Sequence, residues 1–185
     1  MRWIAVVVFA FFLFATLAPA QVPTAGNVFF GYSYYNTNLA NVGRTSLNGW
    51  QGTLEGKVFP AVGIVADLSG GYGSQNFVNP ANTCAIGVVC PTNFSPHVYE
   101  ALFGPRFSAS FGRFRPFAEF EFGAGHVSAN GFPSDTSFAA ALGGGLDYRI
   151  LRPIAWRFQG DYLSTHWFGV HQNNVRLSTG VVIRF

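Results

Sequence analysis

The sequence predicts an all-β protein, an eight-stranded antiparallel up-and-down transmembrane β-barrel. Three observations predict it: eight segments alternate apolar and polar residues, their connections alternate in length, and nearly all the charged residues of these segments lie on one face. Charged residues make up 10% of the chain, against 49% hydrophobic and 17% aromatic. A soluble domain has about 25% charged residues. The composition therefore argues against a disordered chain, a nucleic-acid binder and an ordinary cytosolic enzyme.

The first 20 residues have the pattern of a secretory signal peptide. Arg2 precedes an apolar run over residues 3–14, and Ala18-Pro19-Ala20 supplies the small residues of a cleavage site. The alternative is a retained membrane helix, but the run is shorter than the roughly 20 residues that such a helix needs. We expect residues 1–20 to be removed and residues 21–185 to form the barrel. The remaining ten basic and eight acidic residues give a net charge of +2, which indicates no polyanionic partner.

Alternation with a period of two identifies the eight strands in order. They cover residues 28–36, 50–58, 62–73, 97–109, 115–128, 136–150, 154–165 and 174–185. Most are longer than the five or six residues usual in soluble proteins. They reach the 9–11 residues, roughly, with which a tilted strand crosses a bilayer.

The connections between these segments alternate in length. Residues 37–49, 74–96, 129–135 and 166–173 are longer and rich in Asn, Ser, Thr and Gly, whereas residues 59–61, 110–114 and 151–153 are short turns. Short periplasmic turns opposite longer outer loops are typical of an outer-membrane barrel with both termini inside. The sequence therefore predicts a location in the cell outer membrane.

One face of the segments collects seven of the eight acidic residues and six basic residues. These are Glu55 and Lys57 in 50–58, Asp67 in 62–73, Glu100 and Arg106 in 97–109, Glu119 and Glu121 in 115–128, Asp147 and Arg149 in 136–150, Arg157 and Asp161 in 154–165, and Arg176 and Arg184 in 174–185. The near balance predicts charges that pair inside a closed lumen. Arg44, Arg113, Arg115 and Arg152 fall in or beside connections.

Alternation alone also fits a soluble lipocalin-like barrel, with its apolar face inside. The low charge favours the membrane version, because a water-facing exterior needs more charge. The terminal aromatic Phe185 ends the segment with the best alternation. Aromatic residues also gather near strand ends, as interfacial girdles require: Tyr34, Tyr35, Trp50, Tyr72, Tyr99, Tyr148, Trp156 and Trp167.

Four segments carry a family resemblance: VFFGYSY at 28–34, PFAEF at 116–120, LGGGLDY at 142–148 and GVVIRF at 180–185. With them, residues 21–185 resemble the OmpA-type transmembrane barrels, the small opacity-protein-like outer-membrane proteins of Gram-negative bacteria. The resemblance implies contact with outer-membrane lipid and lipopolysaccharide, and a non-enzymatic role in envelope structure or surface interaction. It also implies that the last strand, ending at Phe185, is the signal read by the barrel-assembly machinery.

Cys84 and Cys90 are the only cysteines and lie in the longest connection. Two cysteines in a loop of a secreted protein usually pair, so we expect a disulfide between them. A metal site needs more ligands, and His97 alone does not provide them.

Two further functions are considered. His126 and Ser128 share a face, faintly similar to the His-x-Ser pair of outer-membrane lipid A deacylases, in which a His activates a Ser. The acidic partner expected about a dozen residues later would fall near Ala140, which cannot serve.

A narrow low-conductance channel is the other alternative. An eight-stranded barrel is filled by side chains, although glycines on the polar face leave room for small cavities.

Glu119 and Glu121 could form a paired-carboxylate site, but a buried structural network is the simpler interpretation. In such a network Glu121→Leu is expected to weaken folding. The sequence predicts no catalytic, cofactor-binding or metal-binding residue.

Overall fold

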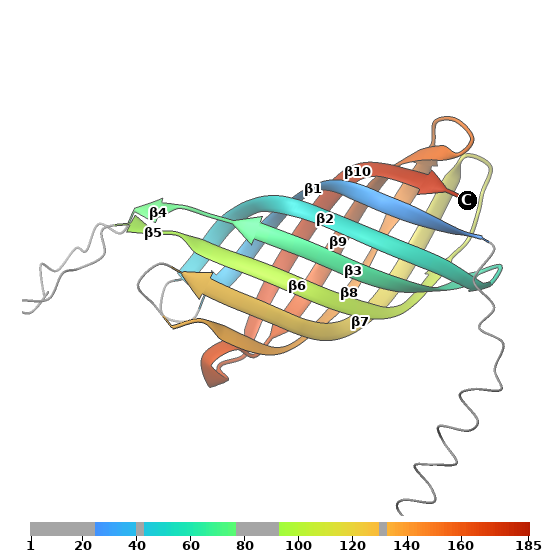
Figure 1. Cartoon of the computed structure of the whole chain (residues 1–185). Coiled ribbons are helices and arrows are strands. Elements are labelled where there is room, and N and C mark those ends of the chain that lie inside the picture. The colour runs from blue at the N-terminus through green and yellow to red at the C-terminus, as the bar shows by residue number, and fades with distance from the viewer. Residues whose placement is uncertain (1–24, 40–42, 77–92, 130–132) are drawn as a thin grey trace, which may run out of the picture.

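The computed structural model describes residues 25–39, 43–76, 93–129 and 133–185. Eight long strands form a closed antiparallel barrel in which sequential strands are neighbours (Figure 1). They are β1 (Gly26–Leu39), β2 (Gly43–Phe59), β3 (Val62–Tyr72), β6 (Pro96–Ser108), β7 (Phe114–Ala129), β8 (Asp135–Arg149), β9 (Ile154–Thr165) and β10 (Gln172–Arg184). The predicted fold class is confirmed. Among the described residues, no helix is long and apolar enough to cross a membrane.

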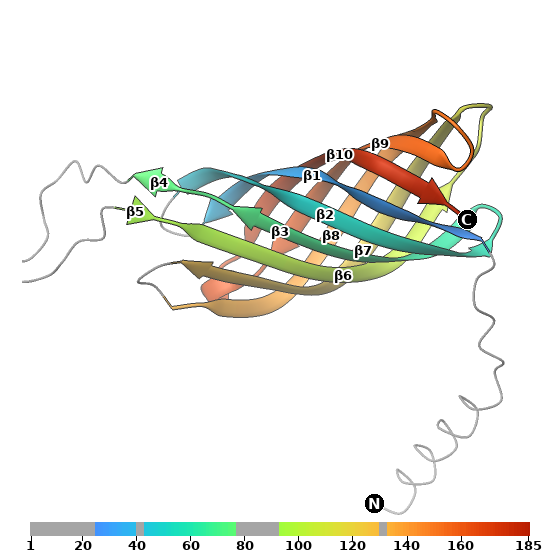
Figure 2. The same ribbon diagram turned by 45° about the horizontal axis from the view of Figure 1, so that its top comes forward.

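Pairing of the first and last strands closes the barrel. β1 and β10 are in register from Asn27↔Arg184 to Asn36↔Val175. The Gly26 amide donates to the Phe185 carbonyl at 2.9 Å, and the Phe185 amide donates back at 3.1 Å. These ends lie on the same side as the short connections 60–61, 109–113 and 150–153, and we call this side the turn end (Figure 2). The opposite side is the loop end. Closure leaves no edge strand, which a lipid-embedded sheet requires.

The predicted loop at residues 37–49 is wrong, because β1 and β2 continue through it. Thr37 pairs with Thr45 and Asn38 with Arg44, so the connection comprises residues 40–42 alone. Thr37, Thr45 and Leu47 are buried, which shows that the alternation persists. Small polar residues suggested a loop by composition, although they continue the barrel wall.

The other connections at the loop end also carry structure. The short strands β4 (Gln75–Asn76) and β5 (Asn93–Phe94) extend the β3–β6 hairpin. A 3-10 turn, η1 (Trp167–Gly169), joins β9 to β10.

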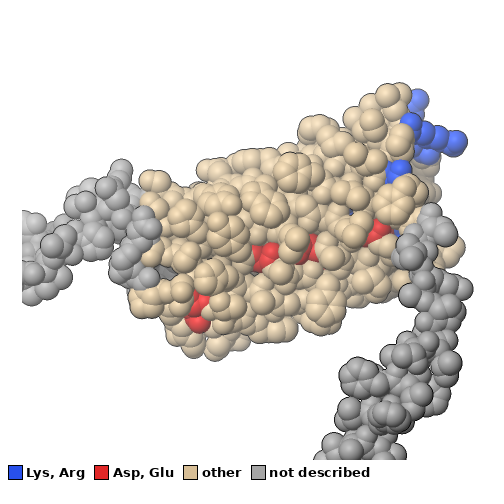
Figure 3. All heavy atoms as spheres, viewed as in Figure 1, with Lys and Arg blue, Asp and Glu red and all other residues tan. Residues whose placement is uncertain are grey.

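The exterior of the barrel is apolar. Along β10, Val175, Leu177, Val181 and Ile183 are exposed. Between them lie buried residues, so exposed and buried positions alternate along the strand. In Figure 3 most of the visible outer wall is uncharged, a few acidic atoms show between its side chains, and basic side chains gather at the turn end. Such a band matches the hydrocarbon of a bilayer.

The lumen is apolar near the loop end. A buried cluster there includes Tyr35, Leu47, Leu163 and Trp167, and the Trp167 indole donates to the Gly125 carbonyl at 3.0 Å. The sequence analysis assigned Tyr35 and Trp167 to the interfacial girdles. Their burial shows that this assignment is wrong. Tyr35 lies on the inward parity of β1, and the β9–β10 connection carries Trp167 into the barrel.

Glycines make room for the charged side chains inside. A Cβ on Gly63 would stand 2.7 Å from Oε1 of Glu55, and one on Gly143 would overlap Oδ1 of Asp161. Because these glycines have no side chain, the carboxylates of Glu55 and Asp161 can occupy the space beside them.

The register predicts a specific cross-link between the first and last strands. Ser33 and Ser178 are paired inside the lumen, with their hydroxyl oxygens 3.1 Å apart. In a background with Cys84→Ser and Cys90→Ser, Ser33→Cys with Ser178→Cys is expected to form a disulfide on oxidation. The readout is a non-reducing gel of the boiled protein, on which the closed chain migrates faster.

The matched control is Ser33→Cys with Thr179→Cys, because Thr179 is the next residue along β10 and lies on the opposite face. Equal cross-linking of both pairs would contradict the register and the inward parity of Ser178.

Candidate functional site: the charged lumen

The charged residues predicted for the polar face, apart from Arg149, lie inside the barrel. All seven of its acidic residues are buried. Arg106, Arg157 and Arg176 are also buried, with 0% exposure. Lys57 and Arg184, with side-chain exposures of 13% and 23%, lie nearer the turn end.

Arg176 on β10 joins three carboxylates from different walls. Its Nη2 lies 2.8 Å from Oδ2 of Asp67 on β3 and 2.8 Å from Oδ2 of Asp161 on β9. Its Nη1 lies 3.4 Å from Oε2 of Glu100 on β6 and donates to the Ser69 hydroxyl at 2.7 Å. A planar guanidinium with five donors can span several acceptors in this way. One side chain thus ties β10 to the far wall.

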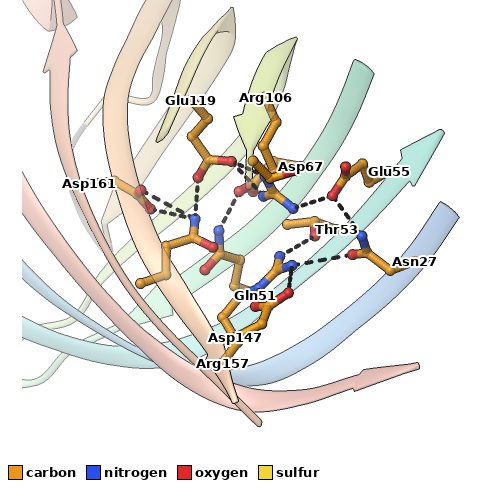
Figure 4. Close-up of polar contacts among 12 residues, drawn as sticks. Asn27, Gln51, Thr53, Glu55, Asp67, Arg106, Glu119, Asp147, Arg157 and Asp161 are labelled. Atoms are coloured by element: carbon orange, nitrogen blue, oxygen red, sulfur yellow. Dashed lines mark hydrogen bonds and ion pairs between the residues drawn. The ribbon is translucent and has the colours of Figure 1, made fainter. Parts of the chain in front are cut away.

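Arg106 on β6 makes a second bridge (Figure 4). Its Nε donates to Oε2 of Glu119 at 2.6 Å, and its Nη1 donates to Oε2 of Glu55 at 3.2 Å. Glu55 also accepts from the Asn27 amide at 2.6 Å. The chain of contacts therefore runs from β7 across β6 to β2 and β1.

Arg157 on β9 makes the third bridge. It binds both oxygens of Asp147, at 2.7 and 3.1 Å, and reaches Asn27 at 3.3 Å and Thr53 at 3.4 Å. Paired hydrogen bonds of this kind are the strongest that a guanidinium makes with a carboxylate.

Two lumen aromatics complete the network, and the sequence analysis missed their role. The Arg157 guanidinium carbon lies 5.1 Å from the Phe29 ring centroid and 4.6 Å from that of Phe117. The guanidinium carbon of Arg106 lies 4.5 Å from the Phe117 centroid. Such contacts add cation–π stabilisation where the charge is desolvated. Phe117 shares the parity of Glu119, and that spacing was the available signal.

Arg115 and Arg149 differ from the sequence-based assignment. Arg115, placed beside a turn by the sequence analysis, donates to Glu55 at 3.3 Å and to Ser108 at 2.8 Å. Arg149, assigned to the network, instead donates to the carbonyl of Gly112 in the β6–β7 turn. Both lie near the turn end, where a long side chain at either end of a strand can point into the lumen or toward the turns.

Charge is unevenly distributed along the barrel axis. Arg176 serves three acidic residues, whereas near the turn end Glu55 contacts Lys57, Arg106 and Arg115. The lumen is therefore negative in its middle and positive toward the turn end.

Glu121 is the exception among the buried acids. It has 0% exposure, and neither carboxylate oxygen has a hydrogen-bond partner among the described residues. An unpaired buried polar group costs stability, so removing it is favourable. The contacts thus reverse the expectation that replacing Glu121 weakens folding.

His126 and Ser128 lie on the outer face of β7, where His126 makes a hydrogen bond to a residue other than Ser128. Nδ1 of His126 is 2.7 Å from the Thr136 hydroxyl on β8. The nearby Asp135 accepts a hydrogen bond from the Phe168 amide at 2.5 Å. Among the described residues no carboxylate contacts His126, so the orienting member of a triad is not provided there.

Three sequence-based predictions concern residues at or beyond the limits of the structure. The expected disulfide between Cys84 and Cys90 and the expected signal peptide at residues 1–20 lie outside the described residues. Phe185 is 60% exposed on the outer wall at the turn end.

No protein-family model and no curated protein sequence matches the chain. Solved structures do match. Neisserial surface protein A (NspA) has a TM-score of 0.65 at 11% identity, over 87% of this chain and 99% of that chain. Ail of Yersinia pestis, in complex with the heparin analogue sucrose octasulfate, has a TM-score of 0.59 at 11% identity, over 87% and 98%. The N-terminal β-barrel domain of Pseudomonas aeruginosa OprF has a TM-score of 0.51 at 10% identity, over 86% and 99%. The chain therefore has the fold of small outer-membrane barrels.

Replacing Arg176 should destabilise the barrel strongly. Arg176→Met leaves Asp67, Asp161 and Glu100 without their shared cation, and breaking a buried ion pair costs about 3–5 kcal/mol. The free energy of unfolding in urea, measured in lipid vesicles, is expected to fall by that amount. Arg44→Met is the control, because Arg44 is exposed and contacts Asn36. Equal stability of the two variants would contradict the central role of Arg176.

Glu119 and Glu121 provide a matched pair on one face of β7. Glu119 accepts from Arg106 at 2.6 Å and from Gln159 at 2.7 Å, whereas Glu121 has no partner. We expect Glu119→Gln to lower the free energy of unfolding, and Glu121→Gln to raise it by about 1 kcal/mol, because it replaces an unpaired buried carboxylate with a neutral amide. Urea unfolding of both variants measures this difference. A loss of stability in Glu121→Gln would show that the Glu121 carboxylate has a partner.

Proposed function

Because the chain has the fold of small outer-membrane barrels, we propose that it is an integral outer-membrane protein with a non-enzymatic role in envelope structure or surface interaction. The short turns face the periplasm and the loop end faces the outside. Its exterior contacts outer-membrane lipid, including lipopolysaccharide at the loop end.

One observation carries the proposal: the polarity of the barrel is inverted relative to a soluble barrel. Buried charges fill the lumen, while Phe30, Phe138 and Leu142 on the outer wall are 65%, 63% and 62% exposed. In water such a wall would associate with other apolar surfaces, whereas in a bilayer it is solvated. This inversion supports a membrane location.

The connections at the loop end contain few charged residues. Among residues 37–49, 74–96, 129–135 and 166–173, Arg44 and Asp135 are the only residues that carry a full charge. The remainder are small polar, aliphatic, aromatic and histidine side chains, of which Leu47 and Trp167 are buried in the lumen. A surface of this kind favours partners recognised by hydrogen bonds and stacking. It is poorly suited to a highly sulfated ligand such as the one bound to Ail.

Several parts of the proposal concern biogenesis. We expect export with a cleaved signal peptide at residues 1–20, recognition of the strand ending at Phe185 by the barrel-assembly machinery, and a Cys84–Cys90 disulfide in the longest loop. The exposed ring of Phe185 at the turn end is compatible with such recognition.

The channel alternative has weaker support. Arg176, Arg106 and Arg157 cross the lumen at successive positions, and the apolar cluster around Trp167 fills it near the loop end. An ion would have to displace these side chains. The enzyme alternative has weaker support because His126 contacts Thr136 and not a carboxylate.

Mobility of the outer-membrane fraction on a gel, with and without boiling, tests the proposal. A closed barrel resists detergent, so the unboiled band is expected to migrate faster than the boiled one. Recovery in the soluble periplasm without a mobility shift would contradict the membrane assignment.

Two measurements address the alternatives. Lipid A profiles from strains with the native chain and with His126→Ala are expected to be identical, and planar bilayers containing the protein are expected to be silent. A changed lipid A profile would support the enzyme alternative, and discrete conductance steps would support the channel. Either result would contradict the proposed non-enzymatic structural role.

A further inference from the structure

An open pocket of about 240 Å³ lies at the turn end, between the β8–β9 turn and the end of β10. It is lined by Arg149, Leu151, Arg152, Pro153, Arg184 and Phe185. Three guanidinium side chains thus border one small cavity at the turn end.

Two of these arginines, Arg149 and Arg152, have no ion-pair partner among the described residues. All eight acidic residues of the chain belong to the described part, and none is within ion-pair distance of Arg149 or Arg152. Arg184 shares Asp147 with Arg157, at 3.2 and 2.7 Å. In addition, Nε of Arg184 is buried without a hydrogen-bond partner among the described residues. The pocket therefore has an excess of positive charge.

The surroundings of the pocket are apolar. Leu151 is 64% exposed and Phe185 60%, and Ile150 beside them is 50% exposed. A basic pocket with an apolar outer rim fits an amphiphile that has an anionic head and hydrocarbon chains. Figure 3 shows the basic residues gathered at this end, in contrast to the rest of the visible wall.

We propose that this pocket binds the phosphate of an anionic glycerophospholipid in the periplasmic leaflet, with Arg149, Arg152 and Arg184 as the phosphate ligands. The inference rests on the proposed outer-membrane location, which places the turn end at that leaflet. Guanidinium groups suit phosphate because they present paired donors at matching spacing. Leu151 and Phe185 contact the acyl chains, so the lipid connects the β8–β9 turn to the end of β10.

Native mass spectrometry of the folded chain tests this site. The protein in zwitterionic micelles is titrated with dioleoyl phosphatidylglycerol or, separately, dioleoyl phosphatidylcholine. We expect retention of phosphatidylglycerol over phosphatidylcholine, and a loss of about 30-fold in its affinity in Arg149→Gln/Arg152→Gln, since each of the two basic residues contributes about 1 kcal/mol near an anionic lipid. Arg44→Gln, at the loop end, is expected to bind like the native chain.

Three outcomes would overturn the assignment: equal binding of the two lipids, equal loss in Arg44→Gln, or displacement of the lipid by inorganic phosphate as effective as that by phosphatidylglycerol. The last outcome would identify a site for free phosphate. Heat-modifiable mobility of each variant is measured in parallel. A barrel that shifts normally but shows no lipid preference contradicts this inference alone, whereas absence of the shift in the native chain contradicts the proposed function.

Discussion

The backbone hydrogen bonds between β1 and β10 close the sheet, and the other features of the molecule follow from this closure. A closed sheet has no unpaired edge, so its outer wall can lie in hydrocarbon. An apolar wall on strict alternation sends every second side chain inward. The polar residues of the chain therefore meet in a lumen that is too narrow for bulk water.

In this narrow lumen, each of three buried arginines donates hydrogen bonds to several acceptors. Arg176 reaches carboxylates on three other strands, and Arg106 and Arg157 make comparable bridges. Buried ion pairs are stable when their remaining donors and acceptors are also satisfied. Asn27, Thr53 and Ser69 supply those contacts. The positive excess left at the turn end then becomes available to a ligand.

Much of this architecture could be predicted from the sequence, because the alternation has a period of two and the charges follow it. Strand number, inward parity and the short turns depend only on that local pattern. The extension of β1 and β2 as far as residues 39 and 43 could not be predicted. Thr and Asn are common both in loops and in strands that continue beyond the membrane. Partners across the lumen, the inward position of Trp167 and the isolation of Glu121 depend on which distant strands face one another. Alternation carries no information about that arrangement.

Collision of a nitroxide label with membrane-dissolved oxygen tests the central claim, the inverted polarity of the barrel, most directly. Leu177 and Ser178 are consecutive on β10 and face outward and inward, with exposed fractions of 53% and 5%. In lipid vesicles, a label at Leu177→Cys is expected to collide readily with oxygen and rarely with a water-soluble nickel chelate. A label at Ser178→Cys is expected to be accessible to neither. Higher oxygen accessibility at Ser178 than at Leu177 would contradict the account.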